Sequence, residues 1–95
     1  MGKAEMIQQE LEKVIRETAE KEGLAVPRCK IEVFLNPEGT ADYLMEYIGK
    51  EGKPLGLGFR NIRPVNSEDF NDPKFRVRLV HNLGLWFKAQ AERDK

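Results

Sequence analysis

Apolar residues near the start of the chain recur every three or four positions. This spacing gathers them on one side of an α-helix and leaves charged residues on the other. The recurring positions are Ile7, Leu11, Val14, Ile15 and Thr18/Ala19. Gly23 favours the left-handed conformation that commonly ends a helix, and Pro27 prevents the helix from resuming. We therefore predict an amphipathic helix over residues 3–22 whose apolar stripe packs on a core.

The pattern then changes to strict alternation over residues 29–35, which is typical of a strand. The following Asn36-Pro37-Glu38-Gly39 fits a tight hairpin turn closed by a glycine bulge. Pairing Asn36 with Thr40 sets apolar or aromatic residues opposite one another: Leu35 and Ala41, Val33 and Tyr43, Ile31 and Met45, Cys29 and Tyr47. A helix over 41–49 is the alternative, but this register favours a second strand over 40–48.

Leu55, Leu57 and Phe59 alternate with small or polar residues and predict a third strand that ends at Pro64 at the latest. This segment contains Gly56 and Gly58 but not the third glycine that a nucleotide-binding turn needs, so we do not expect such a turn here. Because glycine has no side chain, these two positions are expected to admit bulky neighbours or a partner's backbone. Residues 66–73 are polar and predict a connection with one helical turn capped by Ser67.

The last part of the chain alternates again. Phe75, Val77 and Leu79 define one face, and the turn-like His81-Asn82-Leu83-Gly84 follows them. Pairing His81 with Leu85 predicts a second hairpin with strands over 75–80 and 85–90, although residues 85–93 also suit a helix. We expect one α+β domain over residues 1–95, in which the N-terminal helix packs on one face of an antiparallel meander of four to five strands.

The same patterns define an expected core. It contains the helix stripe and the inward positions of the strands: Leu11, Val14, Ile31, Val33, Leu57, Phe59, Val77 and Leu79. The opposite face of such a sheet is commonly exposed to water.

Composition narrows the function classes. The chain has 16 basic and 16 acidic residues, one Cys and one His, so it has no global positive field and no Cys/His zinc site or intrachain disulfide. A single Cys suits a reducing compartment, and no apolar run is long enough for a membrane span, so we expect a cytoplasmic protein. Charge is uneven along the chain, since residues 1–51 contain seven basic and eleven acidic residues and residues 52–95 contain nine and five.

The sequence contains few residues whose expected positions suit catalysis. Cys29 falls on a core-facing strand, His81 in a turn, and Glu68 and Asp69 in a polar loop without an apolar pocket to shift their pKa values. We expect no enzymatic activity and no cofactor.

The outer face of the predicted second hairpin is the candidate site. There Arg78 would lie opposite Lys88, and such like-charged pairs destabilise a sheet, which suggests that the cations are kept for an anionic partner. Exposed apolar residues at the other end of the sheet would extend this surface. The candidate contact residues are Arg60, Arg76, Arg78, Val80, Trp86, Lys88, Phe34 and Leu44.

This surface predicts a small module that binds another protein with an acidic and apolar surface, as a regulator, inhibitor or assembly component. The alternative is binding of RNA or single-stranded DNA, with Trp86 stacking on a base. Self-association of the chain is also compatible with exposed apolar residues.

Overall fold

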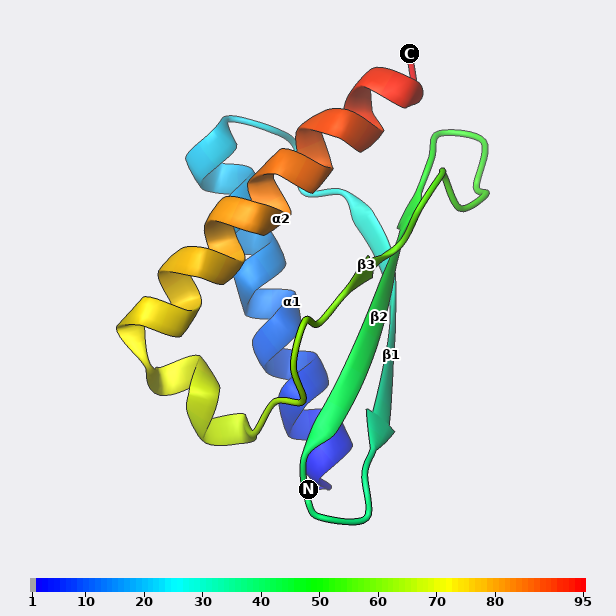
Figure 1. Cartoon of the computed structure of the whole chain (residues 1–95). Coiled ribbons are helices and arrows are strands. Elements are labelled where there is room, and N and C mark those ends of the chain that lie inside the picture. The colour runs from blue at the N-terminus through cyan, green and yellow to red at the C-terminus, as the bar shows by residue number, and fades with distance from the viewer. Residues whose placement is uncertain (1) are drawn as a thin grey trace.

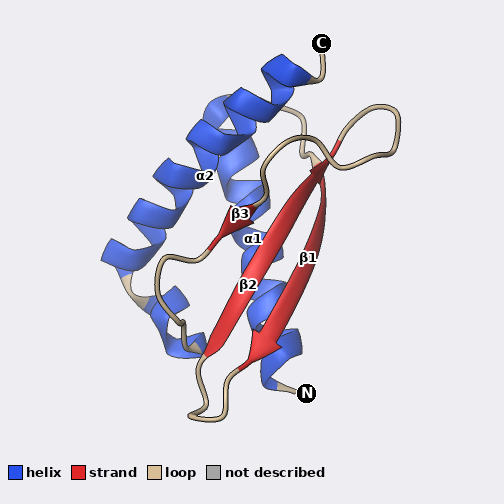
Figure 2. Cartoon of the chain, turned by 45° about the vertical axis from the view of Figure 1, so that its right-hand side comes forward, coloured by secondary structure: helices blue, strands red, loops and turns tan. Residues whose placement is uncertain are grey.

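The computed structural model describes residues 2–95 and contains two long helices and a three-stranded antiparallel sheet (Figure 1). The strands are ordered β1-β2-β3, and both helices lie on the same face of the sheet (Figure 2). The elements are α1 (Lys3–Glu22), β1 (Arg28–Leu35), β2 (Ala41–Ile48), β3 (Phe59–Arg60), the 3-10 helix η1 (Ser67–Asn71) and α2 (Pro73–Arg93). The α+β class is confirmed, but the predicted four to five strands are too many.

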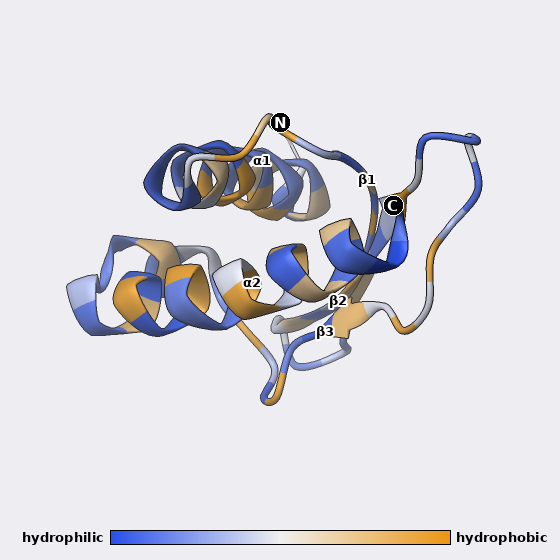
Figure 3. Cartoon of the chain, turned by 90° about the horizontal axis from the view of Figure 1, so that it is seen from above, coloured by the Kyte–Doolittle hydropathy of each residue, from blue (hydrophilic) through white to orange (hydrophobic). Residues whose placement is uncertain are grey.

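The predicted N-terminal helix is confirmed as α1. Its apolar stripe is buried, and the view from above in Figure 3 shows apolar and polar residues alternating along the coils of the helices. Gly23 adopts a left-handed φ of 67°, and the N–H of Leu24 donates to the Ala19 carbonyl at 2.9 Å. This arrangement satisfies the last carbonyls of the helix and turns the chain toward β1.

The first hairpin has the predicted register. Leu35 pairs with Ala41, and the pairing continues without a shift to Arg28 and Ile48. Gly39 closes the turn with a φ of 94°, and the Asn36 N–H donates to the Thr40 carbonyl at 2.8 Å. The helical alternative for residues 41–49 is therefore wrong.

The third strand is much shorter than predicted. The strand contains only Phe59 and Arg60, which pair with Met45 and Leu44 of β2, and on either side of it Pro54 and Val65 form single bridges to Ile48 and Ala41. Leu57 is 81 % exposed, so its predicted place in the core is wrong. The glycines that flank it leave too few side chains to hold a regular strand against the core, and residues 55–58 form a loop instead.

The predicted second hairpin is wrong, because residues 73–93 form the single helix α2. Asp72 caps this helix by accepting the Lys74 N–H at 3.0 Å, and Pro73 occupies the first turn, where its missing N–H costs nothing. Gly84 is buried in the helix interior, and a side chain there would come within 2.7 Å of the Glu22 carboxylate. The glycine thus permits close packing on α1 where a turn was predicted.

Helical geometry also redistributes the predicted core. Leu79 is buried together with Leu83 and Phe87, whereas Val77 is 67 % exposed on the other side of α2, so its predicted burial is wrong. Leu11 and Val14 are buried as predicted, and Ile31, Val33 and Phe59 are partly buried against the core. Among the described residues, neither long helix has an apolar run sufficient to cross a membrane.

Candidate functional site

The predicted basic face of a second hairpin does not exist. Residues that alternate along a strand share one face, but on α2 the same residues point in different directions around the helix axis. The five candidates of this segment therefore separate into distinct environments. Arg78 lines a cleft, whereas Arg76, Lys88, Trp86 and Val80 have structural contacts.

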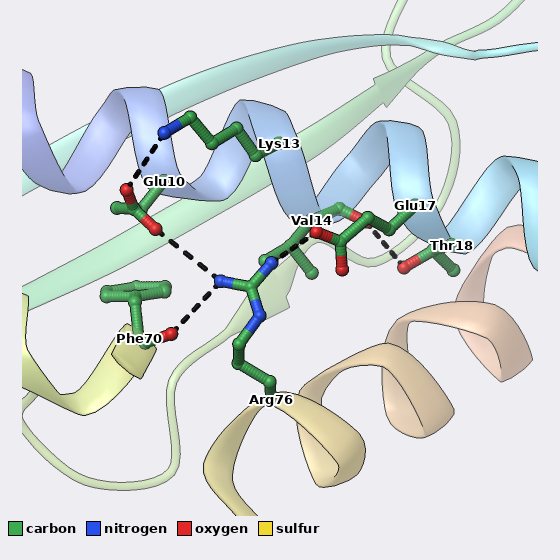
Figure 4. Close-up of polar contacts among 7 residues, drawn as sticks. All are labelled: Glu10, Lys13, Val14, Glu17, Thr18, Phe70 and Arg76. Carbon is green, nitrogen blue, oxygen red and sulfur yellow. Dashed lines mark hydrogen bonds and ion pairs between the residues drawn. The ribbon is translucent and has the colours of Figure 1, made fainter. Parts of the chain in front are cut away.

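Arg76 joins α2 to α1 and η1, as Figure 4 shows. Its guanidinium pairs with Glu17, lies 3.5 Å from the Glu10 carboxylate and donates to the Phe70 carbonyl at 3.0 Å. A guanidinium with three internal partners has little capacity left for a ligand. Arg76 therefore links the two helices, and its sequence-based assignment to a binding surface stays a prediction.

Lys88 is paired in the same way. Its ammonium lies 2.9 Å from the Glu22 carboxylate at the end of α1. The hydrogen bond from Lys88 lowers the pKa of Glu22 below its ordinary value, and the nearby positive charge acts in the same direction. Lys88 and Arg76 thus connect the acidic first half of the chain to the basic second half.

Trp86 is an internal anchor. Its indole N–H donates to the Leu57 carbonyl at 2.9 Å, and its ring packs against the rings of Tyr47, Phe59 and Phe87. Val80, also predicted to be outward-facing, is partly buried against the core. These two residues hold the 55–58 loop and the sheet against α2 and do not form an exposed contact face with the cations.

Phe34 and Leu44 lie on the sheet face that the helices leave uncovered. Phe34 is 49 % exposed, whereas Leu44 is partly buried because its side chain covers Gly58, where an added Cβ would lie 2.7 Å from it. Gly58 therefore admits a bulky neighbour of the same chain, which was one of the two occupants expected from the sequence. These two apolar residues lie apart from the candidates on α2.

Two predicted residues do meet. Arg60 and Arg78 line one cleft, together with Arg63, between the first half of α2 and the segment 59–66. The cleft has a volume of about 750 Å³. Its other lining residues are Tyr43, Phe59, Asn61, Ile62, Pro64, Val65, Asn66, Asp69, Phe75, Leu79 and Asn82. We refer to this feature as the arginine cleft.

The Asn61 side chain fixes one wall of the arginine cleft. Its amide oxygen accepts the Tyr43 N–H at 2.9 Å, and its amide nitrogen donates to Asp42 and to the Arg63 carbonyl, each at 2.8 Å. The side chain thus replaces the next backbone group of β3 and ends the strand. Two bonds of 2.8 Å between Ala41 and Val65 then return the chain to the sheet. The intervening residues project as a braced loop.

The opposite wall comes from η1 and α2. The Asn66 N–H donates to the Asp69 carboxylate at 2.8 Å, so Asn66, and not the predicted Ser67, is the capping residue that precedes η1. Phe75 packs edge-on against the buried Phe70 at a ring separation of 5.2 Å. These contacts set the start of α2, from which Arg78 and Asn82 line the cleft.

The arginine cleft is electropositive. Within residues 2–95, none of Arg60, Arg63 and Arg78 forms an ion pair, whereas Arg76 forms two. The cleft contains one acidic side chain, Asp69, whose carboxylate accepts the Asn66 N–H. Three arginines thus line a cleft with otherwise polar and apolar walls, and none of them has an acidic partner within residues 2–95.

Sequence reasoning missed Arg63 and Ile62. Ile62 is 91 % exposed and lies between two arginines in the run Arg60-Asn61-Ile62-Arg63-Pro64. The available signal in the sequence is a branched apolar residue between two arginines, two positions before a proline. The pattern predicts only the end of a strand there, because no local signal indicates that α2 passes beside this loop.

The nucleophilic and phenolic side chains are not prepared for proton transfer at neutral pH. Burial raises the pKa of the Cys29 thiol to about 11 and that of Tyr43 to about 12. A thiol with such a pKa is almost entirely protonated at neutral pH and is a poor nucleophile. Across residues 2–95, no cluster of three His, Cys, Asp or Glu side chains is placed to hold a metal ion.

Comparison of the chain with protein-family models, with curated protein sequences and with solved structures gave no match.

Proposed function

We propose that this protein is a small non-enzymatic binding module that holds an acidic segment of a partner protein in the arginine cleft. The observation that carries the proposal is the group of three arginines, Arg60, Arg63 and Arg78, which line a partly apolar cleft without forming ion pairs to described residues. Each guanidinium retains donors for a carboxylate, and arginine binds carboxylates through two parallel hydrogen bonds.

The apolar part of the cleft indicates that charge is not the only determinant. Ile62 is almost fully exposed at the cleft, and Tyr43, Phe59, Phe75 and Leu79 contribute to the walls. Burying an apolar side chain of a partner beside them would add a contribution that salt does not screen. The preferred segment therefore combines Asp or Glu with at least one large apolar residue.

Size supports a short segment as the ligand. A volume of about 750 Å³ falls in the range of pockets that hold small ligands or a few side chains. We therefore expect a few residues of the partner to enter the cleft, with further contacts outside it.

The geometry favours the nucleic-acid alternative less, because Trp86, the residue expected to stack on a base, donates its indole N–H to Leu57 and packs against Phe59 and Phe87. Binding of an oligonucleotide in place of an acidic peptide would contradict the proposal.

The experiment uses three fluorescent probes of equal length. The first is a capped peptide with Asp and Glu residues around a Leu-Phe pair, the second has Asn and Gln at the acidic positions, and the third is a single-stranded DNA of mixed sequence. Fluorescence anisotropy measures their affinities for the full chain. The acidic peptide should bind at least about tenfold more tightly than its amide counterpart, as expected for charge-assisted hydrogen bonds.

Substitutions locate the binding. Arg63→Gln and Arg78→Gln should each lower the affinity for the acidic peptide by about tenfold. Lys74→Gln, which removes an exposed cation of α2 outside the cleft, should leave this affinity unchanged. Equal binding of the acidic and amide peptides would refute the proposal. So would DNA binding that is tighter than peptide binding and declines steeply with added salt.

A further inference from the structure

Strand β1 forms an open edge of the sheet. It is eight residues long and is the outermost strand of the sheet that residues 2–95 form (Figure 2). Because the Asn36 N–H points to Thr40, alternation directs the backbone groups of the even-numbered residues of β1 toward β2. The N–H and C=O groups of Cys29, Ile31 and Val33 therefore point away from the sheet, where they can pair with another strand.

The core is also incompletely covered along this edge. Ile31 and Val33 are only partly buried, whereas their β2 counterparts Met45 and Tyr43 are almost fully buried, and Cys29 is partly buried as well. A groove of about 380 Å³ lies between α1 and β1, and Ile15, Val26, Cys29 and Ile31 contribute to its lining. A strand added to β1 would cover this groove with the side chains of its inner face.

We infer that β1 pairs antiparallel with β1 of a second copy of this chain, about a two-fold axis through Ile31. In this register Cys29 lies opposite Val33 of the second copy on the apolar face, and Ile31 lies opposite its own equivalent. On the other face Lys30 lies opposite Glu32 of the second copy, and the symmetry forms this pair twice. The two three-stranded sheets would then form one continuous sheet of six strands.

Charge selects this register among the symmetric alternatives. An axis through Glu32 would place the two Glu32 carboxylates opposite each other, and an axis through Lys30 would do the same with two ammonium groups. In the single copy, Lys30 and Glu32 lie 3.5 Å apart along one side of β1 and are both accessible. They can therefore exchange partners across the edge without breaking a contact to the core.

The ends of the strand limit the pairing. Pro27 has no N–H to donate, so the ladder ends where Leu35 of the second copy would reach it. This edge lies on the β1 side of the sheet, whereas the arginine cleft involves β3 and the first half of α2. The dimer therefore leaves the cleft open and does not depend on the proposed ligand.

Charge reversal tests the inference by sedimentation equilibrium over a range of protein concentrations. Lys30→Glu and Glu32→Lys should each weaken the dimer by at least about tenfold, because each replaces two attractive pairs by two repulsive ones. Mixing the two variants should restore a dimer, since the opposite charges then meet across the edge. The matched control Lys74→Glu, on the exposed start of α2, should dimerise as the parent chain does.

Folding of each variant is checked by thermal unfolding. Lys30 also faces Glu46 across the hairpin, whereas Glu32 faces Leu44, so Glu32→Lys removes no cross-strand ion pair within the hairpin. Amide hydrogen exchange adds an independent readout: the amides of Cys29, Ile31 and Val33 should be protected in concentrated solution and should exchange faster on dilution. A parent chain that stays monomeric at every concentration would overturn the inference, as would a dimer that survives both single substitutions.

Discussion

Gly39 holds the first hairpin in register through its backbone conformation. Its φ of 94° lies in the region that a β-branched residue resists. Gly39→Val should therefore lower the free energy of unfolding by about 1–3 kcal/mol. Urea unfolding monitored by circular dichroism measures the change. Glu38→Val, at the exposed neighbouring position, should change it by less than about 0.5 kcal/mol, and an equal loss in the two variants would show that the glycine conformation is not the cause.

Tyr43 makes the fold sensitive to alkali. Burial raises its pKa to about 12, while the unfolded chain retains the ordinary value of about 10. Its contribution is fully present below pH 10 and is lost as the pH rises to about 12, because the unfolded state then releases a proton that the folded state keeps. The loss attributable to Tyr43 is on the order of 2–3 kcal/mol.

Urea unfolding across this pH range, compared between the parent chain and Tyr43→Phe, measures the alkaline effect. The variant should lose less stability above pH 10 than the parent chain loses. Parallel pH dependences in the two proteins would rule out Tyr43 as the source.

At the scale of the element, the first hairpin was predictable and α2 was not. In the hairpin, the alternation of side chains and the turn residues independently indicate one register, and the structure has that register. In α2 the spacing of the apolar residues fits two patterns, since Phe75 and Leu79 suit both the alternation of a strand and the four-residue spacing of a helix. The local signal for a helix was Asp72-Pro73, a cap followed by a first-turn proline, but Gly84 suggested a turn.

The arginine cleft could be predicted only in part for a related reason. Arg60 and Arg78 were identified as candidates from the sequence, but their meeting depends on α2 passing beside the braced loop that contains Ile62 and Arg63. That arrangement follows from tertiary packing of Phe75 on Phe70 and of Trp86 on Phe59, which no local pattern encodes. For the same reason, the sequence does not distinguish Arg76 and Lys88, which form ion pairs within the chain, from Arg60 and Arg78.

Two arginines one half-turn apart on α2 should therefore behave differently. Arg76→Ala removes bonds to α1 and leaves the Phe70 carbonyl without its side-chain donor, so it should cost about 1–2 kcal/mol of stability. Arg78→Ala should change stability by less than about 0.5 kcal/mol, because its side chain forms no ion pair to a described residue. Urea unfolding of both variants tests the contrast, and similar losses would contradict the assignment of their roles.

At the scale of the molecule, the opposite charges of the two halves of the chain meet between the helices. Glu10, Glu17 and Glu22 of α1 face Arg76 and Lys88 of α2. The uneven distribution of charge along the sequence thus allows ion pairs between α1 and α2, although the net charge of the whole chain is zero. The positive charge that remains unpaired is concentrated at the arginine cleft.

Sodium chloride should accordingly lower the stability of the parent chain, by under about 1 kcal/mol for each exposed pair that it screens. The double variant Arg76→Ala/Lys88→Ala should be less stable at low salt but should depend less on salt. The urea midpoint at increasing sodium chloride, compared between the two proteins, gives the result. An unchanged salt dependence would show that the α1–α2 pairs contribute little.

The order of α1 and α2 along the chain also has a consequence for how the protein is made. Leu79, Leu83 and Phe87, which complete the core against α1, all follow the first hairpin in the sequence. A ribosome therefore releases α1 and the hairpin before it releases the residues that cover them. During that interval the apolar stripe of α1 and the open edge of β1 are exposed together in a nascent chain. Assembly of the core must wait until α2 has been synthesised, so the unfinished chain is the species most exposed to aggregation and to chaperones.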